Sequence, residues 1–164
     1  MQYSEQQKFE PNWIKLVLWC IVILCAIVSI IVIAEAKASF IIALLPFIFS
    51  ILLLSLFSQM KLELTINENM LRFKLYPFIS RIITKDKIRQ MQVINYDPIS
   101  EYGGWGIRYG KNGWAYTAKG FYAIKLITSL NKKILIGTSN PEAVSKFLNE
   151  YYPTVFNNEG AKIV

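Results

Sequence analysis

The chain has 164 residues, of which 54% are hydrophobic and 18% charged, and its formal net charge is +7. This length suits a single domain. Histidine is absent, which excludes every mechanism that needs a histidine base or a histidine metal ligand. Both cysteines, Cys20 and Cys25, lie in the first apolar run, so the rest of the chain has neither a disulfide framework nor a cysteine zinc site.

The apolar residues concentrate in two runs near the N-terminus. Residues 13–34 carry a single charge, close to their start, and residues 40–57 carry none. About 20 apolar residues in a helix, at roughly 1.5 Å each, cross a hydrocarbon core of about 30 Å. Because only residues 35–39 separate the runs, we expect a two-helix transmembrane hairpin over residues 13–58. The alternatives are two buried core helices, or a signal peptide cleaved after the first run.

The basic residues predict the orientation of this hairpin. The linker contains only Lys37, which Glu35 offsets. The N-terminal end of the chain has Lys8 and Lys15, and the region after the second run has Lys61, Arg72, Lys74, Arg81, Lys85, Lys87 and Arg89. Cytoplasmic loops carry an excess of Lys and Arg. We therefore expect a multi-pass protein of the cell membrane, with the N-terminal tail (residues 1–12) and the C-terminal part in the cytoplasm.

From residue 60 onward the apolar period changes from helical to two, which is typical of half-buried strands. The predicted strands are residues 61–66, 70–76, 79–84, 88–96, 105–109, 113–118, 121–128 and 133–138. The fifth and sixth of these segments are either two strands or one strand broken by a hairpin. The order of the segments predicts seven antiparallel strands joined by hairpins, in a barrel or sandwich over residues 60–152.

One amphipathic helix, residues 141–152, is predicted to close this β-domain. Asn140 as N-cap followed by Pro141 is one start signal, and a capping box from Ser139 to Glu142 is the other. The apolar face of this helix consists of Val144, Phe147, Leu148 and Tyr151. Residues 153–164 have no pattern and are expected to form a flexible tail.

Strands in hairpin order followed by one C-terminal helix are also the arrangement of a pleckstrin-homology-like (PH-like) barrel. The motif GGWGIR at residues 103–108, GWAY at residues 113–116 and LIGTSNPE at residues 135–142 resemble a bacterial family of membrane-anchored PH-like proteins. The resemblance covers residues 13–152. It implies an α+β membrane protein in which two N-terminal transmembrane helices precede a PH-like domain, and it implies no catalytic residue and no cofactor, because most members are uncharacterised.

Residues 101–120 hold six of the eight glycines. A dinucleotide loop would lead into a helix, whereas this stretch continues as a strand, so we do not expect nucleotide binding. Asn112-Gly113 instead predicts a type I′ hairpin turn. The candidate partner or ligand surface is Gly104, Trp105, Gly106, Arg108, Lys111 and Trp114. In the alternative interpretation these glycines only allow the sheet to coil, and Arg108 is solvated.

Residues 60–164 contain 15 Lys and Arg against 8 Asp and Glu. A basic domain next to an anionic leaflet gains about 1 kcal/mol for each suitably placed base. Lys85, Lys87 and Arg89, in the segment KDKIR, are the candidate lipid-facing residues. The alternative is that they are ordinary solvated surface.

These features favour a non-catalytic, membrane-anchored binding or scaffolding module. The expected partners are another protein, a second copy of the chain or anionic lipid headgroups, without nucleic acid, metal or cofactor. A subunit of a membrane transport or secretion complex is the alternative, although the spans lack the ionisable residues that pores usually contain. An enzyme would have to use scattered carboxylates with no acid–base spacing.

Overall fold

The computed structural model describes residues 1–9, 12–34, 40–110 and 112–157. The chain forms two compact units. One is a β-rich unit made of Met1–Phe9 and Met60–Val164, and the other is a helical unit, Glu10–Gln59. The fold is α+β, as expected.

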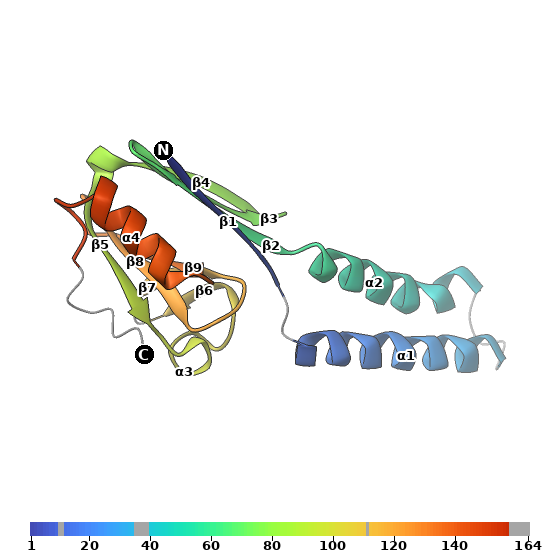
Figure 1. Cartoon of the computed structure of the whole chain (residues 1–164). Helices are drawn as coiled ribbons and strands as arrows, with labels where there is room; N and C mark the ends of the chain where they lie inside the picture. Colours follow the sequence, from blue (N-terminus) through green and yellow to red (C-terminus); the bar gives the residue numbers. More distant parts are fainter. Residues whose placement is uncertain (10–11, 35–39, 111, 158–164) are drawn as a thin grey trace. The chain divides into compact units, whose positions relative to one another are not determined.

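The helical unit consists of α1 (Asn12–Ala34) and α2 (Phe40–Ser58), which pack side by side (Figure 1). Both predicted helices are therefore confirmed within one residue at each end. Each is long and apolar enough to cross a membrane, and only 11% of each apolar window is buried. The buried positions are small or medium-sized and recur seven residues apart in each helix: Val22 and Ser29 in α1, Ala43 and Ser50 in α2. Small residues at such positions allow two helix backbones to approach closely.

The N-terminal segment is a strand, and the expectation of a tail over residues 1–12 is wrong for residues 2–8. Strand β1 (Gln2–Lys8) pairs antiparallel with β2 (Lys61–Asn67) along its whole length. The backbone N–H of Phe9 donates to the carbonyl of Met60 at 3.1 Å, which extends this ladder. The helical unit is thus inserted between two adjacent strands of one sheet, and both of its ends continue into the same β-unit.

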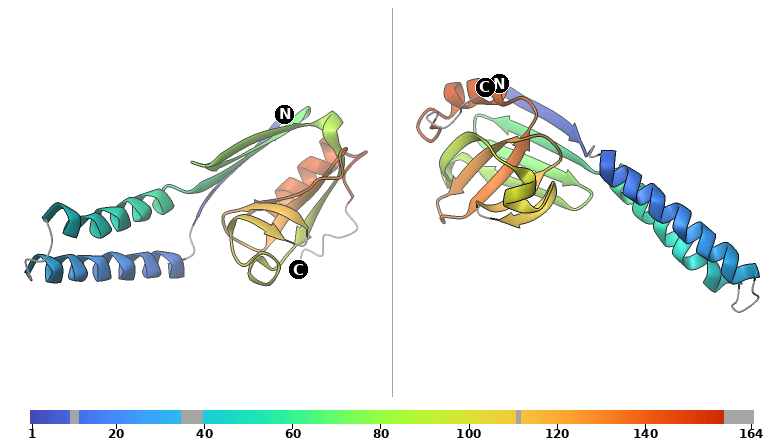
Figure 2. Two further views of the ribbon diagram at one scale, coloured as in Figure 1. Left: turned by 180° about the vertical axis from the view of Figure 1, so that it is seen from behind. Right: turned by 90° about the horizontal axis from the view of Figure 1, so that it is seen from below.

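Nine strands form two separate sheets in the described part of the β-unit (Figures 1 and 2). The four-stranded sheet has the order β1-β2-β3-β4, with β3 at Met70–Tyr76 and β4 at Ile79–Thr84. The five-stranded sheet has the order β5-β8-β9-β7-β6. Its strands are β5 (Ile88–Asn95), β6 (Gly106–Gly110), β7 (Gly113–Thr117), β8 (Tyr122–Thr128) and β9 (Lys133–Thr138).

This topology corrects the prediction of seven antiparallel strands in hairpin order, because the two sheets do not close into a barrel. Strand β9 lies between β8 and β7 and pairs with β7 in parallel. The physical reason lies in β9 itself, where Ile134–Thr138 is buried without alternation. A continuous buried run is typical of a central strand that is covered on both faces.

The core lies between the two sheets. The inward residues of β2 and β3 are fully buried, and those of β5 and β8 cover them from the other sheet: Leu62, Leu64, Ile66, Leu71, Phe73, Leu75, Met91, Val93, Ile124 and Leu126. Phe73 and Tyr116, one from each sheet, have ring centroids 4.8 Å apart. Burying each of these large side chains contributes about 1.5–3 kcal/mol.

Helix α4 (Pro141–Tyr151) covers one edge of this sandwich. Asn140 caps it by accepting a hydrogen bond from the Ala143 N–H at 3.1 Å, so the first of the two predicted start signals is the one used. Val144 and Leu148 are fully buried. Phe147 contacts Tyr3 of the edge strand β1, with ring centroids 6.2 Å apart.

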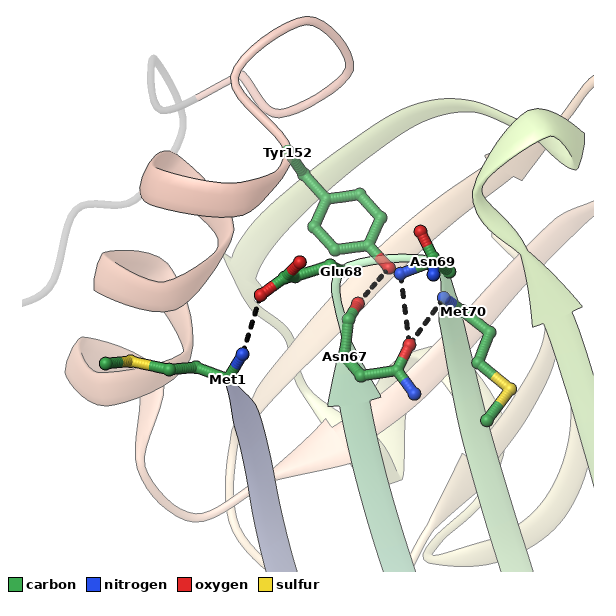
Figure 3. A network of polar contacts seen from close by, with 6 residues as sticks. All are labelled: Met1, Asn67, Glu68, Asn69, Met70 and Tyr152. Carbon is green, nitrogen blue, oxygen red and sulfur yellow. Dashed lines mark hydrogen bonds and ion pairs between the residues drawn. The ribbon is translucent and has the colours of Figure 1, made fainter.

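The segment after α4 is also bound to the β-unit. The Tyr152 hydroxyl donates to the Asn67 carbonyl at 2.6 Å, at the β2–β3 turn (Figure 3). The Met91 N–H of β5 donates to the Val155 carbonyl at 2.7 Å. The flexible tail predicted for residues 153–164 is therefore wrong for residues 153–157, and its remainder lies outside the described residues.

Candidate ligand pocket beside the glycine-rich hairpin

Strands β6 and β7 form the predicted hairpin, but its turn is displaced by one residue. Gly110 pairs with Gly113, so Gly113 belongs to strand β7 and not to the two-residue turn. Lys111 lies outside the described residues. Position 113 still requires glycine, because its φ is +85°.

Two glycines allow the hairpin to lie close to its neighbours. A Cβ on Gly110 would stand 2.5 Å from the carbonyl oxygen of Glu101, and one on Gly113 would stand 2.2 Å from the carbonyl oxygen of Lys133. Both distances are shorter than any real contact of a Cβ atom. These glycines therefore serve backbone packing, which supports the structural interpretation of the glycine-rich stretch.

The short helix α3 (Pro98–Tyr102) supports the hairpin from one side. Asp97 caps this helix: its carboxylate accepts from the N–H groups of Ile99 and Ser100 at 2.9 and 3.2 Å and from the Ser100 hydroxyl at 2.6 Å. These hydrogen bonds, above all the one from the Ser100 hydroxyl, lower the pKa of the Asp97 carboxyl. In turn, the Asn112 amide donates to the Glu101 carboxylate at 3.3 Å, which joins the hairpin loop to α3.

The residues of the predicted hairpin surface do not share one exposed face in the structure. Trp105 is half-buried, and its indole N–H donates to the Gly120 carbonyl at 2.9 Å, while Gly104 and Gly106 are buried beside it. Arg108 is exposed and pairs with Ala115, so its side chain leaves the opposite face of the hairpin from Trp114. Of the predicted set, Trp114 lines the pocket described below.

Trp114 forms an exposed aromatic pair with Tyr109, the residue directly opposite on β6. Their ring centroids are 5.4 Å apart at 65°, an edge-to-face arrangement. Tyr109 is 72% exposed and Trp114 47% exposed. Two large aromatic side chains held together at the surface are typical of a contact site.

This aromatic pair borders a pocket of about 520 Å³ between β4 and the hairpin. The pocket is lined by Arg81, Tyr109, Gly110, Gly113, Trp114, Asn131, Lys132, Lys133 and Ile134. Three of these residues are cationic, and none of the described lining residues is acidic. The volume is within the range of small-molecule sites, about 300–1,000 Å³.

Arg81 enters the pocket from the inward face of the other sheet. It pairs with Phe73 of β3, whose side chain is fully buried, and paired residues share a face. Its guanidinium carbon lies 5.7 Å from the ring centroid of Tyr116, over β7. No carboxylate among the described residues forms an ion pair with it.

The loop between β8 and β9 forms a further wall, and Arg89 holds it. The Arg89 guanidinium donates to the Asn131 side-chain oxygen at 2.7 Å. Asn131 has a φ of +56°, a conformation that asparagine tolerates better than most residues. The Ser129 N–H also donates to the Lys87 carbonyl at 2.9 Å. The loop that carries Lys132 and Lys133 is therefore fixed from the segment Lys85–Arg89.

The three residues of the predicted basic cluster, Lys85, Lys87 and Arg89, differ in their contacts. The Lys85 ammonium donates to the Tyr151 carbonyl at the end of α4, at 2.6 Å, and lies 4.7 Å from the Tyr152 ring centroid. Lys87 is exposed, and Arg89 supports the pocket loop. The sequence interpretation missed Arg81, Tyr109, Lys132 and Lys133, although a charge at an inward position of the apolar segment ISRIIT was a readable signal for Arg81.

The pocket combines cations, an aromatic wall and one side-chain amide, that of Asn131. Arg and Lys bind phosphate and carboxylate through charge-assisted hydrogen bonds, and aromatic rings offer a surface for flat or apolar groups. The site is therefore suited to bind an anion. Comparison with known proteins finds no matching family model, no matching curated protein and no matching solved structure.

Proposed function

We propose that the protein is a non-catalytic binding module anchored in a membrane by α1 and α2. Its basic β-unit would bind an anionic group, on lipid headgroups or on a protein partner, at the cytoplasmic surface. The observation that carries this proposal is the insertion of two apolar helices between paired strands of a basic β-unit.

The exposure of the helices supports the membrane anchor. Only 11% of each apolar window is buried, whereas a core helix of a water-soluble protein is mostly buried. The exposed side chains are large and aliphatic or aromatic, for example Leu24, Ile30 and Phe49 at 60–66%. Leaving such a surface in water is unfavourable by about 25 cal/mol for each Å². A hydrocarbon environment removes this cost.

The pairing of β1 with β2 supports a common side for both ends of the helical unit. Residues before and after the insertion fold into one sheet, which supports a position of both on the same side of the bilayer. The excess of Lys and Arg in the β-unit supports the cytoplasm as this side.

The chemistry of the β-unit supports binding rather than catalysis. A chain without histidine needs carboxylates or lysines for acid–base work, and its pocket is lined by cations with no described acid beside them. A PH-like relationship remains part of the proposal for the β-unit: two sheets with a C-terminal helix at one edge agree with it, and the parallel β7–β9 pair departs from it.

Membrane extraction and cysteine labelling test this proposal on the full chain. After alkaline washing, the protein should stay in the membrane pellet. In a chain with Cys20 and Cys25 replaced by serine, Ser4→Cys in β1 and Asn149→Cys in α4 should react with an impermeant maleimide only after the cells are permeabilised. Ala38→Cys in the linker should react in intact cells and serves as the control. Release by the alkaline wash would refute the anchor, and labelling of β1 and α4 in intact cells would refute the orientation.

A further inference from the structure

We propose that the pocket between β4 and the β6–β7 hairpin binds a phosphate ester, with the phosphate at Arg81, Lys132 and Lys133 and its flat or apolar carrier against Tyr109 and Trp114. This inference rests on the proposed binding function and names the ligand chemistry of that function. Two sources share this chemistry: the headgroup of an anionic phospholipid and a soluble phosphate ester.

The position of Arg81 is the first argument. Arg81 lies on the edge strand β4, its side chain is exposed, and it stands on the inward side of the sheet, so its guanidinium is accessible to a ligand in the pocket. Arg81 has an aromatic ring as neighbour, at 5.7 Å, and no carboxylate partner among the described residues. An anion in the pocket would give this guanidinium a counter-charge. A guanidinium also matches phosphate oxygens in a bidentate geometry.

An inward charge on an edge strand has another known use, since it prevents edge-to-edge aggregation. That use does not require further cations nearby. Here Lys132, in the β8–β9 loop, and Lys133, the first residue of β9, line the same pocket, and Arg89 fixes the loop through Asn131. Cationic residues from both sheets thus line one space, which favours an anion site over an isolated protective charge.

The aromatic pair is the second, independent argument. Tyr109 and Trp114 lie edge to face at 5.4 Å and stay largely exposed beside the cations. A free inorganic ion would leave this aromatic surface uncovered. A carrier with a flat or apolar part would cover it, and aromatic contacts of this kind typically contribute 0.5–1.5 kcal/mol. The ligand is thus a phosphate with a substituent, rather than free phosphate.

Fluorine NMR on the full chain in lipid nanodiscs tests this inference. The four tryptophans are replaced biosynthetically with 5-fluorotryptophan, and the Trp114 signal is identified by its loss in Trp114→Phe. One arm uses phosphatidylcholine discs and titrates glycerol 3-phosphate or adenosine monophosphate. The other arm compares phosphatidylcholine discs with discs that also contain phosphatidylglycerol. Sodium chloride at matched ionic strength is the salt control.

We expect the Trp114 signal to shift and saturate in one arm, which identifies the source, and not to shift with chloride. The Trp105 signal should stay in place, because its indole is bound to the Gly120 carbonyl away from the pocket lining, and it reports that the β-unit is folded. Adenosine monophosphate should bind more tightly than glycerol 3-phosphate if the soluble arm responds, since its base covers the aromatic pair.

Arg81→Met keeps the aliphatic stem over Tyr116 and removes the charge. We expect it to weaken binding about tenfold or more, because a charge-assisted hydrogen bond contributes about 1.5–3 kcal/mol. Arg72→Met is the matched control: Arg72 lies on the outer face of the same sheet, paired with Thr65 and Ile82, and should change binding less than twofold. The inference would be overturned if the Trp114 signal shifted with none of the probes. It would also be overturned if Arg81→Met bound the probe as tightly as the original chain while its Trp105 signal showed a folded β-unit. Neither result would affect membrane anchoring, which extraction and labelling measure separately.

Discussion

Gly113 lies where any other residue type would be strained. Its φ is +85°, and the carbonyl oxygen of Lys133 occupies the space in which a Cβ would stand. Backbone conformation and crowding therefore both require glycine. Only the crowding depends on β9, which is 20 residues further along the chain.

Comparing two glycines separates these causes. Gly113→Ala should destabilise the β-unit by about 1–3 kcal/mol, because the neighbouring strand has to shift as well. Gly104→Ala is the matched control: Gly104 also has a positive φ, +121°, but nothing lies within 4 Å of its added Cβ. Thermal unfolding of the detergent-solubilised full chain, followed by tryptophan fluorescence, measures both. Equal losses in the two variants would show that crowding at Gly113 is unimportant.

At the scale of elements, β1 shows how a polar segment becomes a strand inside a fold. Tyr3, Glu5 and Gln7 point to the inward face. There the Glu5 carboxylate accepts hydrogen bonds from the Tyr3 hydroxyl at 2.8 Å, the Gln7 amide at 3.0 Å and the Thr138 hydroxyl at 2.7 Å, and one from the Ser139 N–H. Burial and the bond to Glu5 raise the pKa of the Tyr3 hydroxyl. Glu5 thus joins β1 to the residues that precede α4.

Glu5→Ala removes this junction. We expect it to lower the free energy of unfolding by about 1–3 kcal/mol, since several partly buried donors lose their acceptor. Glu63→Ala on the adjacent strand is the matched control, because Glu63 faces outward and forms a surface ion pair with Lys61 at 2.8 Å. Such a pair contributes at most about 1 kcal/mol. Chemical unfolding of both variants in detergent compares them, and a larger loss in Glu63→Ala would contradict the role of Glu5.

At the scale of the whole molecule, one sheet contains two segments of the chain, β1 and β2, that are separated by the 50 residues of the helical unit. The β-unit includes Met1–Phe9 as well as Met60–Val164, so a fragment that begins at Met60 lacks β1. It also lacks the acceptor that binds Thr138 and Ser139. Cutting the chain after its apolar runs would therefore not isolate a complete β-unit.

Joining Phe9 to Met60 through Asn-Gly should isolate it. The Phe9 N–H donates to the Met60 carbonyl at 3.1 Å, so the two residues already flank a hairpin position, and Asn-Gly favours the two-residue turn that closes it. We expect this joined chain to be monodisperse in aqueous buffer and to unfold cooperatively. The fragment Met60–Val164 is the control and should be less stable or aggregate, because its β2 edge is unpaired. Size-exclusion chromatography and circular dichroism distinguish the two, and equal stability would show that β1 is dispensable.

The sequence by itself determined what depends on local period and composition. The two apolar helices, most strands after residue 60, the β6–β7 hairpin and the capped helix α4 follow from the spacing of apolar residues and from turn and cap residues, which act over a few positions. Only the tertiary structure decided what depends on distant partners. The strand β1 has no apolar alternation, and on its inward face the Gln7 amide donates to the Gly137 carbonyl while the Glu5 carboxylate accepts from Thr138 and Ser139. The convergence of Arg81, Trp114 and Lys133 on one pocket likewise exists only once the two sheets face each other, because β-pairing joins residues regardless of their separation along the chain.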